Sequence, residues 1–510
     1  MNQPVAEFAT PPDASQRELS SLRWVNSFGQ LPEAFYTRLA PDPLPAPYLV
    51  GISDSALQLI GVDRDAPRTR PFLSIFSGSQ VPDGADPLAA VYAGHQFGVY
   101  VSRLGDGRAI LLGGVRGPDG QEQELQLKGS GRTPYSRMGD GRAVLRSSIR
   151  EFLASEAMHA LGIPSTRALA VIGSDAPVLR ETVETAAVVT RIAPSFLRFG
   201  SFEYFFWQRR HRELRQLADY AIATCFPQCS EAAQPYLELL IQISRRTAQL
   251  MARWQAVGFC HGVMNTDNLS ILGLTIDYGP FTFMDAFDID HVCNHSDDSG
   301  RYAFSRQPAV AHWNLRCLGQ ALLPLTGHAE QTIAAADLFW DEFERSFMEQ
   351  LRAKLGLTQP NDGDAVLVQD TLELLDRHRV DWTAFWRRLS AVDGCAHATA
   401  GSASLRALFD EPAELEAWLA RYRARLASEP VAAAERATRM NRVNPKFVLR
   451  NHLAEHAIRQ ARGDDGPRDF SEVDRLLGCL QRPYDEQPQF EHYALPPAAD
   501  VSAVPLSCSS

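Results

Sequence analysis

The spacing of hydrophobic positions divides the chain into a strand-rich region and a helix-rich one. Within 123–128 apolar and polar residues alternate, so that Leu125 and Leu127 face one side of a predicted strand and the polar residues face the other. Similar segments, separated by turns rich in glycine and aspartate, recur up to about residue 192. We predict strands at 99–103, 109–112, 122–128, 168–172 and 186–192 and one helix at 147–161, together forming an α+β lobe.

From about residue 201 the apolar positions follow the helical period. Strand character interrupts this pattern once, at 269–283. Asn444 is a suitable N-cap with Pro445 at the first helical position, so another helix is expected to begin there. Helices are predicted at 213–225, 236–257, 310–323, 335–355, 365–377 and 413–426. The class expected is α+β with two lobes, a small β-rich one and a larger helical one, separated by a cleft.

The two ends of the chain have less regular patterns. Residues 1–20 are polar and are expected to be disordered, and 24–49 mixes short apolar groups with prolines, as an arm wrapped on a body would. Short helices are predicted at 53–59 and 88–92. The last 30 or so residues are rich in proline and are expected to be irregular.

Composition excludes several classes of protein. The 510 residues are 45% hydrophobic and 22% charged, as is usual for a globular protein, and the net charge of −11 argues against a dedicated nucleic-acid binder. The sequence has no apolar run of about 18 residues and no secretory signal, so we expect no membrane span. The eight cysteines are scattered without a CxxC pair, which favours reduced thiols and a cytoplasmic protein.

A short repeat flanks one lysine. Gly-Asp-Gly-Arg-Ala occurs at 105–109 and again at 139–143, on either side of Lys128. The glycines permit close approach of the backbone, and each arginine could reach a phosphate. Asp-Gly turns are also common in hairpins, so that alternative stays open. The position of the two copies favours phosphate binding.

Two downstream segments carry oxygen ligands. The segment 261–268 ends in Asp267-Asn268, and an aspartate followed by glycine comes soon after it. Asparagine and aspartate oxygens are suited to Mg²⁺ or Mn²⁺. In protein kinases a strand lysine, a helix glutamate, a loop asparagine and a later aspartate occur in that order. The corresponding residues here are Lys128, Glu151, Asn268 and Asp277.

One position departs from the kinase pattern. Counting from His261, the catalytic aspartate of a kinase would fall on Val263, which cannot accept a proton. A carboxylate is found instead at Asp267, directly before Asn268. This argues against ordinary transfer of the γ-phosphoryl group by that route.

These motifs resemble the selenoprotein O family, kinase-like proteins that act as protein adenylyltransferases. The resemblance extends from about Arg23 over nearly the whole chain, and its landmarks are the segments 92–98, 127–137, 261–268 and 444–446. It implies that ATP lies inverted relative to kinases, so that AMP is transferred to Ser, Thr or Tyr hydroxyls of proteins, the enzyme itself included. UTP with Mn²⁺ is a second donor that the resemblance suggests.

The resemblance also implies roles for individual residues. Asp267 would be the general base, and Asn268 and Asp277 would hold Mg²⁺ or Mn²⁺. Lys128 would contact phosphates and pair with Glu151. The remaining residues of the nucleotide site would be Gly105, Gly107, Arg108, Asp140, Gly141, Arg191 and Arg198.

Ordinary structural roles are the alternatives for several of these residues. Lys128 could lie on an exposed strand, Asp277 in a turn, and Arg191 and Arg198 could pack through their aliphatic stems. Glu156 is a rival to Glu151. The run of acidic and histidine residues in 285–298 could form a second metal site, although a solvated loop is favoured.

We expect five parts, which are an N-terminal arm with short helices (1–85), a nucleotide-binding kinase-like N-lobe (86–200), a C-lobe with catalytic and metal loops (201–330), a helical extension (331–480) and an irregular tail (481–510). The partners expected are a nucleoside triphosphate and protein substrates, with no nucleic acid and no membrane, and the protein is expected to be a monomer. Two other functions stay open, a kinase that uses Asp267 as its base and a catalytically silent nucleotide-binding scaffold. The resemblance further suggests a redox link between Cys508 and Cys293, and the alternative is an inert thiol in the tail.

Overall fold

The structure is a computed structural model that describes residue 19, residues 22–392, residues 400–498 and residue 506. The tail cysteine Cys508, Cys395 and nearly all of the segment predicted to be disordered lie outside the described residues. Among the helices of the described part, none is both long and apolar enough to cross a membrane.

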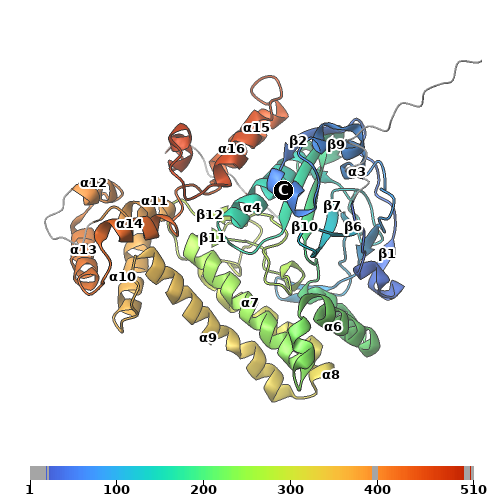
Figure 1. Cartoon of the computed structure of the whole chain (residues 1–510), viewed down its shortest axis with the longest axis horizontal. Helices are drawn as coiled ribbons and strands as arrows, with labels where there is room; N and C mark the ends of the chain where they lie inside the picture. The colour runs from blue at the N-terminus through green and yellow to red at the C-terminus, as the bar shows by residue number, and fades with distance from the viewer. Residues whose placement is uncertain (1–18, 20–21, 393–399, 499–505, 507–510) are drawn as a thin grey trace, which may run out of the picture.

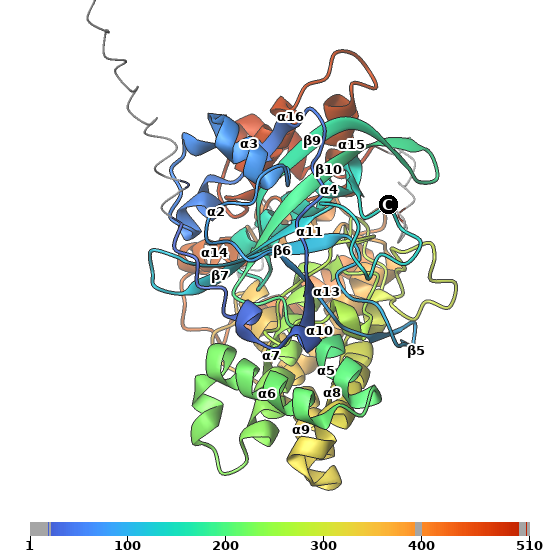
Figure 2. The ribbon, with the colours of Figure 1, turned by 90° about the vertical axis from the view of Figure 1, so that its right-hand side faces the viewer.

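The N-terminal half is built around one antiparallel sheet (Figures 1 and 2). Its order is β1-β3-β6-β7-β10-β9-β2, with β8 paired to β10. The strands are β1 (Tyr36–Arg38), β2 (Tyr48–Ile52), β3 (Leu88–Ala90), β6 (Ala109–Arg116), β7 (Glu122–Lys128), β8 (Ala143–Val144), β9 (Arg167–Leu179) and β10 (Val183–Ala193). Two small hairpins lie outside it, β4 (Gly94–Gln96) with β5 (Val99–Val101) and β11 (Phe259–Cys260) with β12 (Thr282–Phe283).

Alternation along β7 separates the two faces of this sheet. Leu125 and Leu127 pack into a buried cluster with Phe72 of helix α3, on one face. Gln126 and Lys128 therefore point to the other face, where they are also buried. The short elements α2 (Asp54–Leu59) and α3 (Arg70–Phe76) belong to the apolar face, and α4 (Leu145–Ala160) packs against β9 and β10.

Helices form the second half of the molecule, and those between residues 199 and 354 lie below the sheet in Figure 2. A long core helix, α7 (Pro235–Val257), packs along α9 (Ala329–Lys354) and α8 (Gln307–Thr326). The preceding helices are α5 (Phe199–Trp207) and α6 (His211–Cys225). The 3₁₀ helices are η1 (Phe28–Gln30), η2 (Glu33–Phe35), η3 (Ala66–Arg68), η4 (Pro227–Glu231), η5 (Thr266–Asn268), η6 (Phe304–Arg306) and η7 (Pro488–Ala494).

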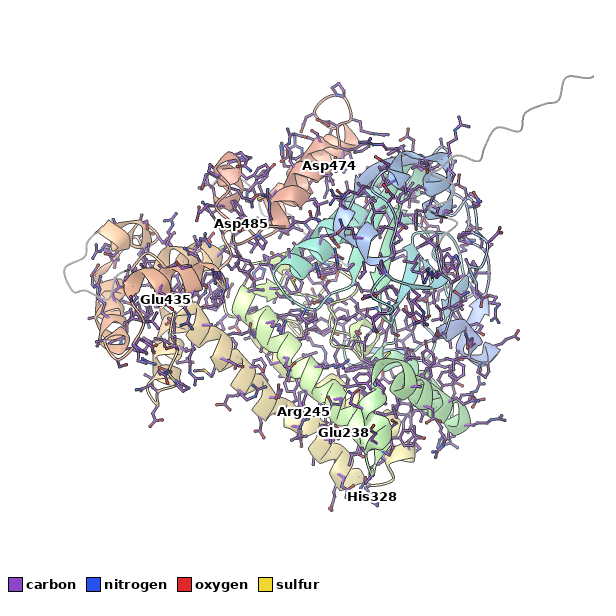
Figure 3. The ribbon with its side chains drawn as sticks, viewed as in Figure 1. Glu238, Arg245, His328, Glu435, Asp474 and Asp485 are labelled. Atoms are coloured by element: carbon purple, nitrogen blue, oxygen red, sulfur yellow. The ribbon has the colours of Figure 1, made fainter. Side chains whose placement is uncertain are left out.

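The C-terminal extension forms two groups of helices. The first contains α10 (Asp364–Arg377), α11 (Trp382–Leu389), α12 (Ala400–Arg406), α13 (Ala413–Leu426) and α14 (Ala433–Asn441). This group has its own buried cluster, which includes three tryptophans, Trp382, Trp386 and Trp418. The second group, α15 (Asn451–Arg462) and α16 (Ser471–Leu480), returns to pack on α4. In Figure 3, Glu435 on α14 and Asp474 on α16 mark the two groups.

The α+β class is confirmed, and several expected elements match closely, among them the strand at 122–128 and the helix at 413–426. The predicted helix at 88–92 is wrong, because Leu88–Ala90 forms strand β3 between β1 and β6. The arm expected at 24–49 contributes β1 and the start of β2, so it extends both edges of the sheet.

Two further expectations are corrected. Only Thr282–Phe283 of the strand-like stretch 269–283 is a strand, because two glycines, a proline and the positive φ of Asp277 (55°) interrupt the extended backbone. The helix expected to begin at Asn444 begins at Asn451. The Asn444 side chain is not an N-cap, since its Nδ2 donates to the backbone oxygen of Lys354, the last residue of α9, at 3.0 Å.

Candidate active site

Lys128 ends strand β7 in a buried ion pair. Its Nζ lies 2.5 Å from Glu151 Oε2 of α4 and 3.7 Å from Asp277 Oδ1. Burial lowers the pKa of Lys128, while Glu151 and Asp277 favour its charged form. The lysine is 8% exposed, so it is not the surface residue that an isolated strand pattern would allow.

Asp277 is held by two arginines. Arg191 donates to its Oδ1 and Arg198 to its Oδ2. Burial alone would raise the pKa of Asp277, but Arg198, Arg191 and Lys128 hold it well below its usual range. The aspartate is therefore ionised, with its backbone in the left-handed region that non-glycine residues seldom adopt.

The register of β7 and β10 places these cations together. Arg191 pairs with Gln126 across the two strands, and its Nη2 donates to the Gln126 side chain. Lys128 is two residues along the same face of β7. A register shift between Thr190 and Arg191 also interrupts the pairing of β10 with β9, as a bulge does when it redirects a side chain.

Asp267 lies in η5 with one carboxylate oxygen unpaired. Gln96 Nε2 donates to its Oδ2 at 3.4 Å, whereas its Oδ1 is buried without a hydrogen-bond partner in the described part of the chain. Arg198 Nη1 donates to the Asp267 backbone oxygen at 2.6 Å, which fixes the loop. Burial raises the pKa of Asp267 to about 7, although Arg198 opposes the shift. The carboxylate can thus exchange a proton near neutral pH.

Gly94 gives part of the segment 92–98 a structural role, which the sequence alone did not assign: it leaves room for the Asp267 side chain. A Cβ on Gly94 would lie 2.6 Å from Asp267 Oδ1 and 2.9 Å from its Cβ, so a larger residue would displace the carboxylate. The next residue, His95, donates its backbone N–H to Thr266 Oγ1 at 2.7 Å. Gln96 also contacts this loop, through its hydrogen bond to Asp267 Oδ2. The β4 hairpin therefore positions the loop that carries Asp267.

The side-chain amide of Asn268 makes one hydrogen bond, through its nitrogen. Its Nδ2 donates to the Val263 backbone oxygen at 3.0 Å, which leaves Oδ1 as an acceptor, and the residue lines the same cavity as Asp277. The unpaired Asp267 Oδ1 and the spare lone pairs of Asp277 add further oxygen donors. A set of donors made only of oxygens fits Mg²⁺ or Mn²⁺.

A cavity of about 620 Å³ connects these residues. Eleven of the twelve residues predicted for the site line it, while Glu151 lies behind Lys128. Those eleven are Gly105, Gly107, Arg108, Lys128, Asp140, Gly141, Arg191, Arg198, Asp267, Asn268 and Asp277. Its volume is in the range usual for small-molecule sites.

The two Gly-Asp-Gly-Arg segments line this cavity but differ in detail. Asp106 is buried and accepts from the Ala90 N–H at 3.0 Å, whereas Asp140 pairs with Arg180 at 2.7 Å. The glycine before Arg142 is needed for packing, because a Cβ on Gly141 would lie 2.1 Å from Gly131. Arg180 was missed by the sequence analysis, and no motif marks it.

The other candidates have structural partners. Glu156 forms an ion pair with Arg167 at 2.7 Å, away from Lys128. In the run 285–298, Asp288 lies 2.7 Å from Arg379, Asp285 pairs with Arg450, and Asp297 accepts the N–H of Tyr302. Within the described residues the one cluster of potential metal-binding side chains is a different group, His95, Glu203 and Cys317. Cys293 is a buried free thiol.

Comparison with known proteins identifies a family whose model matches most of the chain. Residues 18–480 match the family model described as protein adenylyltransferase SelO. The chain is 55% identical over 497 residues to a protein from Cupriavidus metallidurans named protein nucleotidyltransferase YdiU, covering 94% of this chain and 90% of that one. Proteins of the same name from Dechloromonas aromatica (55% over 490 residues, 95% and 97% covered) and Burkholderia pseudomallei (54% over 505 residues, 95% of each) are similar to the same extent.

Proposed function

The chain belongs to the SelO family of protein adenylyltransferases, and on that premise we propose that its catalytic site is the cavity lined by Lys128, Asp267 and Asp277. The enzyme is a protein nucleotidyltransferase, whose substrates are a nucleoside triphosphate and a protein. The proposal adds that ATP donates AMP, with UTP as a second donor of UMP, and that the acceptors are Ser, Thr or Tyr hydroxyls. It also includes a two-lobed kinase-like arrangement with lobes at 86–200 and 201–330.

Positive charge in the cavity supports the binding of a triphosphate. Lys128, Arg191 and Arg198 are buried and are already held by Glu151 and Asp277, so they need little reorganisation when phosphates arrive. Donors fixed in advance stabilise the charge that develops around phosphorus in the transition state.

The unpaired Oδ1 of Asp267 carries the proposal for the base. The acceptor hydroxyl oxygen attacks the α-phosphorus and forms a new O–P bond. The bond to the bridging oxygen breaks, pyrophosphate leaves with that electron pair, and the hydroxyl proton goes to Asp267 Oδ1. A carboxylate with a pKa of about 7 is half ionised at neutral pH and can accept the proton there. Val263 lines the same cavity but offers no proton acceptor.

Asn268 and Asp277 are the residues that would hold the metal. A divalent cation bound there supplies positive charge to the phosphates. Asn268 would present its oxygen from the end of η5, and Asp277 from the irregular segment before β12.

A labelling assay tests this function against its two alternatives. The purified chain and an acceptor protein are incubated with Mg²⁺ or Mn²⁺ and with ATP labelled at the α- or the γ-phosphate, and Asp277→Ala is the control. We expect label on protein from the α position only, and none from the variant. Label from the γ position alone would make the protein a kinase. Retained ATP binding without label of either kind would favour a silent scaffold.

We also propose a monomer that works in the cytoplasm with reduced thiols. The six described cysteines are free, which supports the reduced state, and Cys293 Sγ donates to the Cys260 backbone oxygen at 3.6 Å. The pairing of Cys293 with Cys508 stays a prediction, since Cys508 lies outside the described residues. Light scattering after gel filtration tests the monomer, and non-reducing electrophoresis of Cys508→Ser tests the link.

A further inference from the structure

A second cavity, of about 680 Å³, lies at the C-terminal ends of the long helices α7 and α9. Its walls come from the C-terminal ends of α4, α7 and α9, from residues 442, 443 and 445, and from Tyr484. Helices α7 and α9 lie side by side (Figure 1). None of the residues assigned to the catalytic site lines it. Its apolar wall includes Leu161, Ile163, Val257 and Val443.

Lys354 lines this cavity and lacks a counter-charge. The chain has three lysines, at 128, 354 and 446, among its 50 basic residues, so arginine supplies nearly all of its cations. Lys128 pairs with Glu151, and Lys446 lies 2.6 Å from Glu486. Lys354 is 4% exposed, and within the described residues its ammonium has no ion-pair or hydrogen-bond partner. The ammonium lies over the face of the Trp386 ring, at 5.1 Å from the centroid.

The other charged groups around the cavity are mostly cations. Arg253 of α7 and Arg442 line it, and so does Arg345 of α9. The one carboxylate of the lining is Glu349, which is 70% exposed and lies 3.4 Å from Arg345. Arg253 is held in place by the backbone, since its Nη1 donates to the Gly162 backbone oxygen at 2.5 Å. The lining thus holds four cations and one carboxylate, and Arg345 has a second carboxylate partner just outside it, Glu342 at 2.5 Å.

A buried ammonium without a partner is unfavourable unless something outside the chain compensates it. Burial lowers the pKa of Lys354 to about 7, and an anion in the cavity would restore its charged form. Arginine and lysine together are the side chains that proteins use to hold phosphate. We propose that this cavity binds a phosphate-bearing small molecule, whose phosphate is held by Lys354 and the lining arginines and whose organic part contacts the apolar wall.

The landmark segment 444–446, which the catalytic site does not use, builds one wall of this second site. Asn444 Nδ2 donates to the Lys354 backbone oxygen at 3.0 Å, and the Asn444 backbone oxygen accepts from Arg387 at 3.1 Å. Pro445 lines the cavity. Lys446 is anchored on the carboxylate of Glu486. The motif therefore fixes the end of α9 where Lys354 enters the cavity.

Acetylation of the three lysines tests the proposal, because each amine can be followed separately by peptide mass spectrometry. The full chain is treated near neutral pH with N-acetoxysuccinimide, with and without glucose 6-phosphate, and acetylation of Lys128 reports on the catalytic site in the same sample. At about ten times its Kd, the sugar phosphate is expected to slow acetylation of Lys354 about tenfold and to leave Lys446 unchanged. Inorganic phosphate and glucose are the comparison probes.

Protection by glucose to the same degree, or none by either phosphate, would overturn the proposal. Equal protection by inorganic phosphate would overturn the role given to the organic part. Calorimetric titration with glucose 6-phosphate gives a second readout should the buried amine not react. There, Lys354→Met is expected to weaken binding at least about tenfold and Lys354→Arg to recover most of it. Unchanged affinity in Lys354→Met would reject the site.

Discussion

Lys128 and Lys354 are both buried, yet their surroundings differ in charge. Lys128 lies 2.5 Å from Glu151 and shares Asp277 with two arginines, so its charge is compensated within the protein. Lys354 lines a cavity of similar size, and within the described residues its ammonium has no carboxylate partner. A compensated cation is held in place for chemistry, whereas an uncompensated one leaves room for an incoming anion. Burial alone does not distinguish these two situations, and the partners do.

Removing Asp277 should have the largest effect on nucleotidyl transfer. Asp277→Ala leaves Arg191 and Arg198 without their shared carboxylate and removes a proposed metal ligand. We expect transfer of α-label to fall by at least about 10³-fold, and stability to fall by about 3–5 kcal/mol. Labelling kinetics and chemical denaturation measure the two effects. Activity within tenfold of wild type would show that the compensated cluster is not the catalytic one.

Asp267→Asn should have the next largest effect and should change the pH profile. Loss of a general base costs about 10²–10⁴-fold in rate, while ATP affinity should stay within about twofold because the cations are untouched. In the wild type the base must be ionised, so the rate should rise with pH through about 7 and level off above it. The variant should lose this dependence. A wild-type rate that is flat between pH 6 and about 8 would contradict the assignment.

Glu151 and Glu156 offer a comparison, since both lie buried on α4 and both form ion pairs, Glu151 with Lys128 and Arg191 and Glu156 with Arg167. Glu151→Gln should lower transfer about 10–100-fold, because Lys128 loses its positioning partner. Glu156→Gln breaks the pair with Arg167. It should lower the free energy of unfolding by about 3 kcal/mol and leave the transfer rate nearly unchanged. Comparing the denaturation midpoints with the transfer rates separates positioning from stability. Equal losses of transfer in the two variants would remove the special role of Glu151.

Lys354→Met should leave transfer unchanged and raise stability. The folded-state pKa of Lys354 is about 7, below its unfolded value of 10.5, so the unfolded chain binds the proton more readily. The gain should therefore be full below pH 7, roughly 1–3 kcal/mol, and should disappear as the pH approaches about 10.5. Denaturation series at several pH values measure it. A variant less stable than wild type at neutral pH would mean that the ammonium is compensated after all.

Local patterns predicted the parts of the molecule that local physics decides. The strand at 122–128 follows from the alternation around Leu125, and the order of lysine, glutamate, asparagine and aspartate identified the polar cluster before its geometry was known. Strands β1 and β3 were not predicted, because each has only three residues and so shows little periodicity. Their neighbours in the sheet stabilise them.

The rest of the site depends on contacts between distant residues. Arg180 reaches Asp140 across 40 positions, and nothing near either residue in the sequence indicates the pair. Gly94 and Asp267, which are in contact in the structure, are even further apart along the sequence. The lack of an ion-pair partner for Lys354 among the described residues is harder again to foresee, because it depends on how the ends of α4, α7 and α9 meet.

The packing of α15 and α16 on α4 has a consequence for regulation. In protein kinases, the helix that carries the glutamate can swing away and separate it from the lysine. Here the residue next to Glu151, Arg150, donates to the Phe281 backbone oxygen at 2.9 Å and to Asn451 Oδ1 of α15 at 3.2 Å. Moving α4 would break both contacts and uncover the helices behind it. These contacts hold α4 where Glu151 meets Lys128, so separating that pair by a swing of α4 would require breaking them.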